Sequence, residues 1–149
     1  MSNKNEIVVT DWIKRIPHKG NFLKLTLSST ERKIFRGKRV SDCEKELHLQ
    51  LPREGKLNDG DLLLTNKKEI FVQVIAQKED LIEIKSDKNF ELIKVAYHLG
   101  NRHVEIQIYE NIIFTKYDYL IEEMLKNFEV NFMKVKKKFF PEKGAFHHE

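Results

Sequence analysis

The spacing of apolar residues changes near residue 76, and this change divides the chain into two parts. Before it, apolar and polar residues alternate in three stretches, and a period of two is typical of strands with one buried face. The stretches are Phe22 to Leu27, Leu47 to Leu51 and Ile70 to Ile75. The turn signals Arg36-Gly37-Lys38 and Asn58-Asp59-Gly60-Asp61 separate them, and no helical rhythm appears. Residues 1–75 are therefore predicted to form a small all-β domain.

Residues 76–140 follow a different pattern, in the order strand, helix, strand, strand, helix, strand. The strands are expected at 81–85, 104–108, 112–117 and 130–135, with a tight turn at Glu110-Asn111. Asp87 and Asp118 can cap the two helices, and Gly100 can end the first in a left-handed conformation. The inner faces are predicted to be Leu92, Val95, Ala96 and Leu99, and then Ile121, Met124, Leu125 and Phe128.

This order is that of a ferredoxin-like βαββαβ domain. The fold class is therefore α+β, with an all-β N-terminal domain at 1–75 and a ferredoxin-like domain at 76–140. The basic end KVKKKFFPEKGAFHHE contains proline, glycine and many charges, so a mobile tail with two histidines is expected at 141–149.

Composition indicates a folded, soluble, cytoplasmic protein. The chain has 149 residues, of which 40% are hydrophobic, and its apolar runs are far shorter than the ~20 residues needed to span a bilayer. The start MSNKNE does not resemble a signal peptide, and the single cysteine, Cys43, cannot form an internal disulfide. The net charge is +4, but the excess of Lys and Arg is spread thinly, mostly over the first half.

His98 and His103 lie on either side of the helix-ending Gly100. Five positions on a helix separate two side chains by about 140°, so these histidines do not form the i, i+4 pair of a helical zinc site. His103 is expected where the helix ends and a strand begins, facing outward. The spacing alone favours an ordinary surface histidine at this position over a functional one. His18 and His48 are interpreted as surface residues, and His98 as a surface residue or a support for a metal ligand.

One imidazole is too few for a metal site, since structural zinc takes four ligands. A two-fold axis would change this, because a homodimer could bring two copies of His103 together. The tail residues His147 and His148 could add further ligands, although they could equally be a solvated chain end. A site of this kind would be open and shared, which suits reversible metal carriage.

Three segments together resemble the UreE-type urease accessory proteins, which are nickel metallochaperones. They are CEKELHLQLPREGKLNDGDLLL, AYHLGNRH and DYLIEEMLKNFEV, and the similarity runs from about Glu31 to the tail. The most specific part is Gly100-Asn101-Arg102-His103. The resemblance implies a β-rich N-terminal domain that holds peptides or partner proteins, and a ferredoxin-like domain that binds metal and dimerises.

The resemblance also assigns roles to individual residues. It implies that His103 binds nickel at the dimer axis and that His147 and His148 assist. The nickel would pass to the urease apoprotein with the help of an accessory GTPase. Some members carry a His-X-His pair where this chain has Tyr117-Asp118-Tyr119, and others have long histidine-rich tails. Two tail histidines imply a small capacity, about one ion per dimer.

Nickel(II) suits such a site because it accepts imidazole nitrogens in open geometries. Copper(II) would bind more tightly and zinc(II) is a further competitor, so geometry, supply or the receiving partner must provide specificity. Metal binding requires neutral imidazole, which for an ordinary histidine means that binding weakens as the pH falls through about 6.5.

Two other classes of function are alternatives. An RNA-binding module could use the open face of a ferredoxin-like sheet, but the strand HVEIQIYE lacks the aromatic pattern of such surfaces, and Glu105 and Glu110 would repel phosphate. A hydrolytic enzyme would need a nucleophile with a base, paired carboxylates or a phosphate loop, and no such motif is present. The chain is therefore predicted to be neither an enzyme nor a nucleic-acid-binding or membrane protein.

Overall fold

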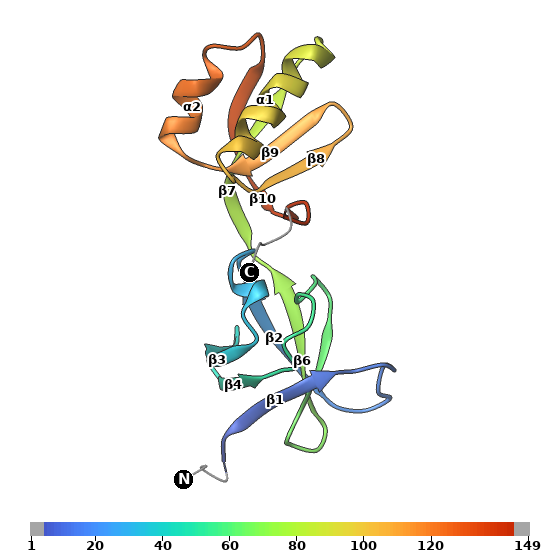
Figure 1. Cartoon of the computed structure of the whole chain (residues 1–149). Coiled ribbons are helices and arrows are strands. Elements are labelled where there is room, and N and C mark those ends of the chain that lie inside the picture. Colours follow the sequence, from blue (N-terminus) through green and yellow to red (C-terminus); the bar gives the residue numbers. More distant parts are fainter. Residues whose placement is uncertain (1–4, 145–149) are drawn as a thin grey trace. The chain divides into compact units, whose positions relative to one another are not determined.

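The computed structural model describes residues 5–144. The chain divides into two compact units, the first ending at Gln77 and the second beginning at Lys78 (Figure 1). Strands make up the first unit apart from one short 3-10 helix, whereas the second combines a sheet with two α-helices. The fold class is α+β, as predicted.

The first unit is a six-stranded sheet in the order β2-β6-β5-β1-β4-β3. β1 runs parallel to β4 and β2 parallel to β6, and the other neighbours are antiparallel. Buried leucine and valine side chains on one side of the strands form its core. The elements are β1 (Ile7–Trp12), β2 (Asn21–Leu27), the 3-10 helix η1 (Glu31–Lys33), β3 (Arg36–Val40), β4 (Glu46–Gln50), β5 (Leu62–Thr65) and β6 (Ile70–Ala76).

The three predicted strands are confirmed as β2, β4 and β6, whose alternating side chains are buried on one face. The turn predicted at Asn58 to Asp61 is also confirmed, because the Asp61 N–H donates to the Asn58 carbonyl at 3.0 Å. The turn predicted at Arg36-Gly37-Lys38 is wrong. These residues begin β3, and Gly37 adopts a φ of 125° within that strand.

The second unit is a four-stranded antiparallel sheet in the order β10-β7-β9-β8, together with two helices. Figure 1 shows both helices beside this sheet. Isoleucines of β7 and β9 pack against the buried faces of both helices, and these faces are the predicted ones. The elements are β7 (Lys78–Lys85), α1 (Asn89–Asn101), β8 (Ile106–Tyr109), β9 (Ile112–Lys116), α2 (Tyr119–Leu125) and β10 (Asn131–Lys138). The predicted ferredoxin-like βαββαβ order is therefore confirmed.

The two helices begin in different ways. Asp118 caps α2 as predicted, since its carboxylate accepts a hydrogen bond from the Leu120 N–H at 2.8 Å. The predicted cap of α1 by Asp87 is wrong, because Lys88 occupies the cap position and supplies no side-chain cap. Lys88 instead forms an ion pair with Glu129, next to the start of β10.

The basic end of the chain starts inside the fold. β10 continues to Lys138, Phe139 is fully buried, and Pro141 is also buried. The predicted tail histidines, His147 and His148, lie outside the described residues. Within the described part of the chain, no helix has both the length and the apolar character needed to cross a membrane.

Candidate metal-binding site

His103 occupies the left-handed position that ends α1, with a φ of 56°. Its N–H donates to the Gly100 carbonyl at 3.0 Å, and the Val104 N–H donates to the Leu99 carbonyl at 3.1 Å. This pair of hydrogen bonds is a Schellman motif, in which His103 is the residue just beyond the cap. The prediction that Gly100 ends the helix is therefore wrong. The helix continues to Asn101, and Gly100 does not have a positive φ.

The motif holds the His103 backbone firmly while its side chain remains exposed. Leu99 and Val104 anchor the turn from both sides, because each belongs to the hydrophobic core of the second unit. A left-handed conformation costs a residue with a side chain about 1 kcal/mol or more, and glycine avoids that cost. Such conformations are concentrated at functional sites. His103 is therefore an imidazole presented outward from a fixed point.

Within residues 5–144, no neighbouring side chain completes a metal site around His103. Residues 5–144 contain no group of three or more histidine, cysteine, aspartate or glutamate side chains that could hold a metal ion. His98 lies one turn earlier on α1, and its ring packs at 5.4 Å from the rings of both Tyr97 and Phe128. His18 is exposed in the loop after β1, and His48 is half-buried on β4 in the other unit.

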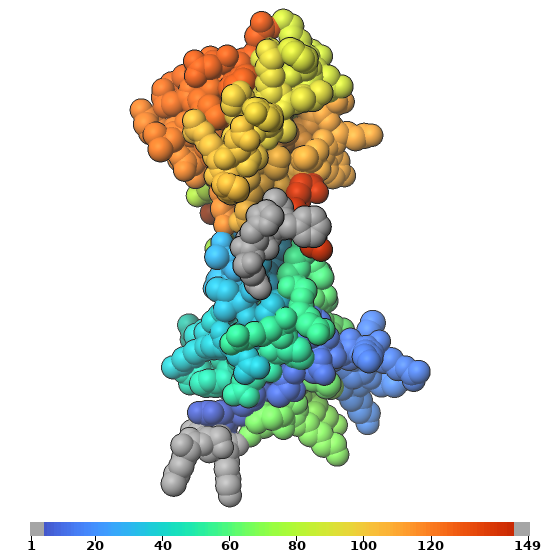
Figure 2. Space-filling view, viewed as in Figure 1, coloured from blue at the N-terminus to red at the C-terminus, as the bar shows by residue number. Residues whose placement is uncertain are grey.

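A row of exposed apolar side chains runs along α1. Phe90, Ile93 and Tyr97 have exposed fractions of 67%, 64% and 64%. Their spacing of three and four residues places them on one face of the helix, away from the buried Leu92, Val95 and Leu99. In Figure 2 the yellow atoms of α1 lie at the surface of the molecule. We call these three residues the α1 stripe. An uncovered apolar face of this kind is typical of a protein interface.

The segment after β10 is fixed to the edge strand β8, close to His103 in sequence. The Glu142 N–H donates to the Ile106 carbonyl at 2.7 Å, and the Glu142 carboxylate accepts from the Ile108 N–H at 3.0 Å. The Phe140 N–H also donates to the Gln107 side chain at 3.0 Å. Ile106 is only three residues beyond His103. The chain beyond Glu142 therefore begins near the turn between α1 and β8.

Two of these features were not predicted from the sequence. The α1 stripe has a clear signal, since Phe90, Ile93 and Tyr97 repeat at helical spacing outside the predicted inner face. Glu142 has no signal of this kind, because a glutamate in a segment with proline and glycine resembles a solvated residue.

Comparison with known proteins identifies relatives along the whole chain. A model of the UreE urease accessory protein C-terminal domain matches residues 79–149. The Urease accessory protein UreE of Prochlorococcus marinus subsp. pastoris is 73% identical over 149 residues, which cover 100% of this chain and 97% of that protein.

Two further proteins with the name Urease accessory protein UreE are similar. That of Prochlorococcus marinus strain MIT 9301 is 63% identical over 100% of both chains. That of Synechococcus sp. strain WH7805 is 41% identical over 124 residues, 83% of this chain and 71% of the relative. With matches of this identity over its full length, the chain belongs to the UreE family of urease accessory proteins.

Proposed function

We propose that this chain is a nickel(II) metallochaperone that delivers its ion to the urease apoprotein, with His103 as its principal metal ligand. The observation that carries this proposal is the position of His103. Its backbone is held in a strained left-handed turn and its imidazole is exposed. Exposure lets the ligand both receive an ion and release it to a partner. A buried, fully enclosed ligand set would favour retention instead.

The proposed site is shared by two chains, because His103 of each chain provides only one imidazole. The α1 stripe supports a homodimer, since burying three large apolar side chains against a second copy would remove them from water. A two-fold axis places the same surface patch of both chains in contact. α1 ends at the turn that carries His103, so pairing of this helix could also bring the two imidazoles together.

The tail histidines His147 and His148 are proposed as additional ligands. Glu142 is fixed to Ile106, and His147 lies five positions further along the chain. Five steps of extended chain span up to about 17 Å, and the three steps from His103 to Ile106 span up to about 11 Å. The tail is therefore long enough for His147 to reach His103 of its own chain or of a partner. Zinc(II) and copper(II) are the proposed competitors of nickel(II).

In this proposal the chain has no reaction of its own and acts in the cytoplasm with the urease apoprotein and an accessory GTPase. The test is transfer: metal-loaded chain is mixed with the urease apoprotein and the GTPase, and urease activity is followed. The parent should activate the apoprotein, and His103→Ala should not. His98→Ala is the matched control, and it should activate as the parent does. Full activation by His103→Ala would overturn the proposed role.

A further inference from the structure

The edge strand β3 of the first unit carries a concentration of positive charge. Residues 32–39 contain five Lys or Arg and no acidic residue. They extend from η1 through most of β3, whose one neighbour in the sheet, among the strands of residues 5–144, is β4. Figure 2 shows this segment, in cyan, at the surface of the molecule. β3 thus combines an open sheet edge with a cationic sequence.

The backbone of β3 presents hydrogen-bonding groups on its open side. The Leu51 N–H donates to the Phe35 carbonyl at 3.0 Å, and the Ser41 N–H donates to the Lys45 carbonyl at 2.8 Å. Antiparallel strands use alternate residues for these bonds, so the odd-numbered residues of β3 face β4. The N–H groups of Arg36, Lys38 and Val40 consequently face away from the sheet, where another strand could accept them.

A groove with mixed apolar and cationic walls lies at the start of β3. It is open, with a volume of about 500 Å³, and its walls are Lys33, Ile34, Phe35, Arg36 and Arg53. The Ile34 side chain is 44% exposed there. Within the described residues, Arg36 and Arg53 form no ion pair with a carboxylate. Their guanidinium groups are therefore available to bind a carboxylate in a bidentate geometry.

We propose that β3 and this groove bind an extended, acidic segment of a partner protein. The segment would add a strand to β3, with its carbonyls accepting the outward N–H groups and its carboxylates against Arg36 and Arg53. An apolar side chain of the segment would cover Ile34. The identity of the partner rests on the proposed delivery of nickel to another protein. The binding surface itself requires no metal.

A nucleic acid fits this surface less well than a polypeptide does. The phosphates of a nucleic acid would pair with the Lys and Arg side chains, but they would not accept hydrogen bonds from the row of backbone N–H groups along β3. Stacking of bases requires exposed aromatic rings, and the only aromatic wall of the groove, Phe35, is half-buried. An alternative explanation for the charge is that lysine and arginine protect an open edge from aggregation. That explanation predicts no specific ligand.

The experiment measures fluorescence anisotropy with the metal-free full chain. The probe is a labelled ten-residue peptide of alternating glutamate and valine, with an alternating lysine–valine peptide and a ten-nucleotide uridine RNA for comparison. Saturable binding of the acidic peptide, with a Kd below about 1 mM, is expected. The basic peptide should not bind, and the RNA should bind at least about tenfold more weakly.

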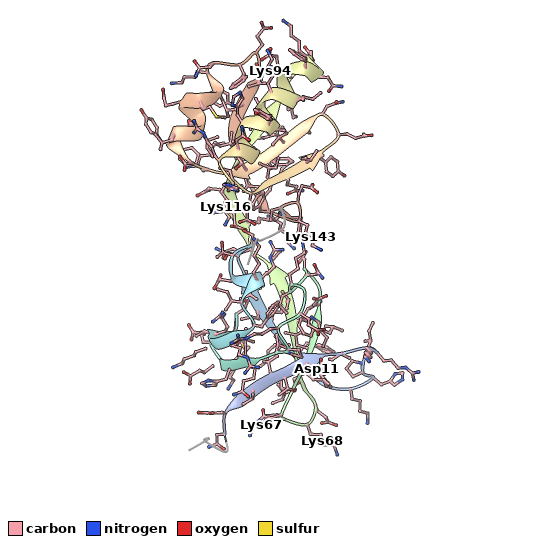
Figure 3. The ribbon with its side chains drawn as sticks, viewed as in Figure 1. Asp11, Lys67, Lys68, Lys94, Lys116 and Lys143 are labelled. Atoms are coloured by element: carbon pink, nitrogen blue, oxygen red, sulfur yellow. The ribbon has the colours of Figure 1, made fainter. Side chains whose placement is uncertain are left out.

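Charge reversal tests the two arginines. Arg36→Glu with Arg53→Glu should weaken binding of the acidic peptide by at least about tenfold. Lys14→Glu with Lys68→Glu is the matched control, since it changes the net charge of the same unit equally. Both of these lysines are exposed, and Figure 3 shows Lys68 at the turn between β5 and β6. The control should bind within about twofold of the parent.

A proline substitution tests strand addition. Lys38→Pro removes an outward N–H, which an edge strand tolerates but an added strand requires. It should weaken peptide binding, whereas Lys38→Ala, which loses the same ion pair with Glu46, should not. The proposal is overturned if the parent fails to bind, if the RNA or the basic peptide binds equally, or if either β3 variant binds as its control does.

Nickel binding by the same variants keeps the two proposals separate. The Arg36 and Arg53 double variant should bind nickel as the parent does, and His103→Ala should retain the acidic peptide. Loss of nickel binding by the double variant, or loss of the peptide by His103→Ala, would contradict this separation of the two surfaces.

Discussion

At the scale of single residues, His103 meets two opposing requirements. The Schellman turn favours glycine at this position, because glycine has no Cβ to clash in the left-handed region. The proposed metal binding requires an imidazole. The hydrogen bonds of the turn and the packing of Leu99 and Val104 hold the histidine in place despite its strain. A residue of this kind is expected to reduce stability in exchange for function.

Replacing His103 by glycine should therefore raise the stability of the fold while it removes nickel binding. His103→Gly should raise the free energy of unfolding by about 0.5 to 1 kcal/mol, because relief of strain outweighs the greater freedom of glycine in the unfolded chain. Urea denaturation measures this change. His103→Ala is the control, since it keeps the strained position and should gain no stability. Both variants should lose nickel binding, and a glycine variant less stable than the parent would contradict the strain.

A second residue-scale feature is the ion pair of Lys88 and Glu129. The hydrogen bond from Lys88 and its positive charge lower the pKa of Glu129, and the same pair raises the pKa of Lys88. Because the pKa of the Glu129 carboxyl is lowered in the folded chain, its ion pair contributes to stability above the pKa of the unfolded chain, about 4.3. This contribution is lost as the pH falls through the pKa of the folded chain. The raised Lys88 pKa means that its contribution is lost only at strongly alkaline pH, as the pH rises through the folded value.

NMR titration of the Glu129 carboxyl checks this pair. Lys88→Gln should raise the pKa of Glu129 toward its ordinary value, because the largest cause of the shift is removed. Lys94→Gln should raise it much less, since the charge of Lys94 is the weakest of the causes. High salt should also reduce the shift, because both side chains are exposed. An equal effect of the two substitutions would contradict the assignment.

At the scale of elements, α1 has two apolar faces, of which the fold buries one. The other, the α1 stripe, should pair with a second copy. Ile93→Glu should convert a dimer into a monomer in sedimentation experiments, because it places a charge in the proposed interface. Ile16→Glu is the matched control, since Ile16 is 78% exposed in the first unit. Dissociation by both variants, or by neither, would show that the stripe is not the interface.

The edge of β8 provides a second prediction at this scale. Glu142→Ala removes the acceptor of the Ile108 N–H, so the Ile108 amide should exchange with solvent faster. If this anchor positions the tail histidines, nickel affinity should also fall, on the order of tenfold. Glu110→Ala is the control.

The same substitution in a chain with His147→Ala and His148→Ala should then have no further effect on nickel affinity. An equal loss in both backgrounds would show that Glu142 acts on the metal by another route.

Sequence patterns predicted the elements that have one buried and one exposed face. β2, β4 and β6 alternate for this reason, and both inner helix faces were identified. β3 was not predicted, because every position in it is exposed or half-buried and its glycine resembles a turn. The predicted end of α1 differs from the observed end by three residues. Gly100 and Asn101 both adopt left-handed conformations readily, so the sequence does not distinguish them from His103 as the residue that ends the helix.

At the scale of the whole molecule, the described residues of one chain do not complete the proposed metal site. Residues 5–144 place a single outward imidazole at the end of α1, without the further ligands that nickel needs. The resemblance to a family proposes His103 as a ligand, but the number of chains that would share an ion is a property of the assembly. The proposed metal site and the proposed peptide-binding surface belong to different units of the chain.

The most direct test is the number of nickel ions bound per chain, measured by calorimetry together with the mass of the assembly in solution. The account predicts one ion per two chains, with tight binding lost in His103→Ala and retained in His98→Ala. One ion bound to each separate chain, with His103→Ala binding as the parent does, would contradict the shared site.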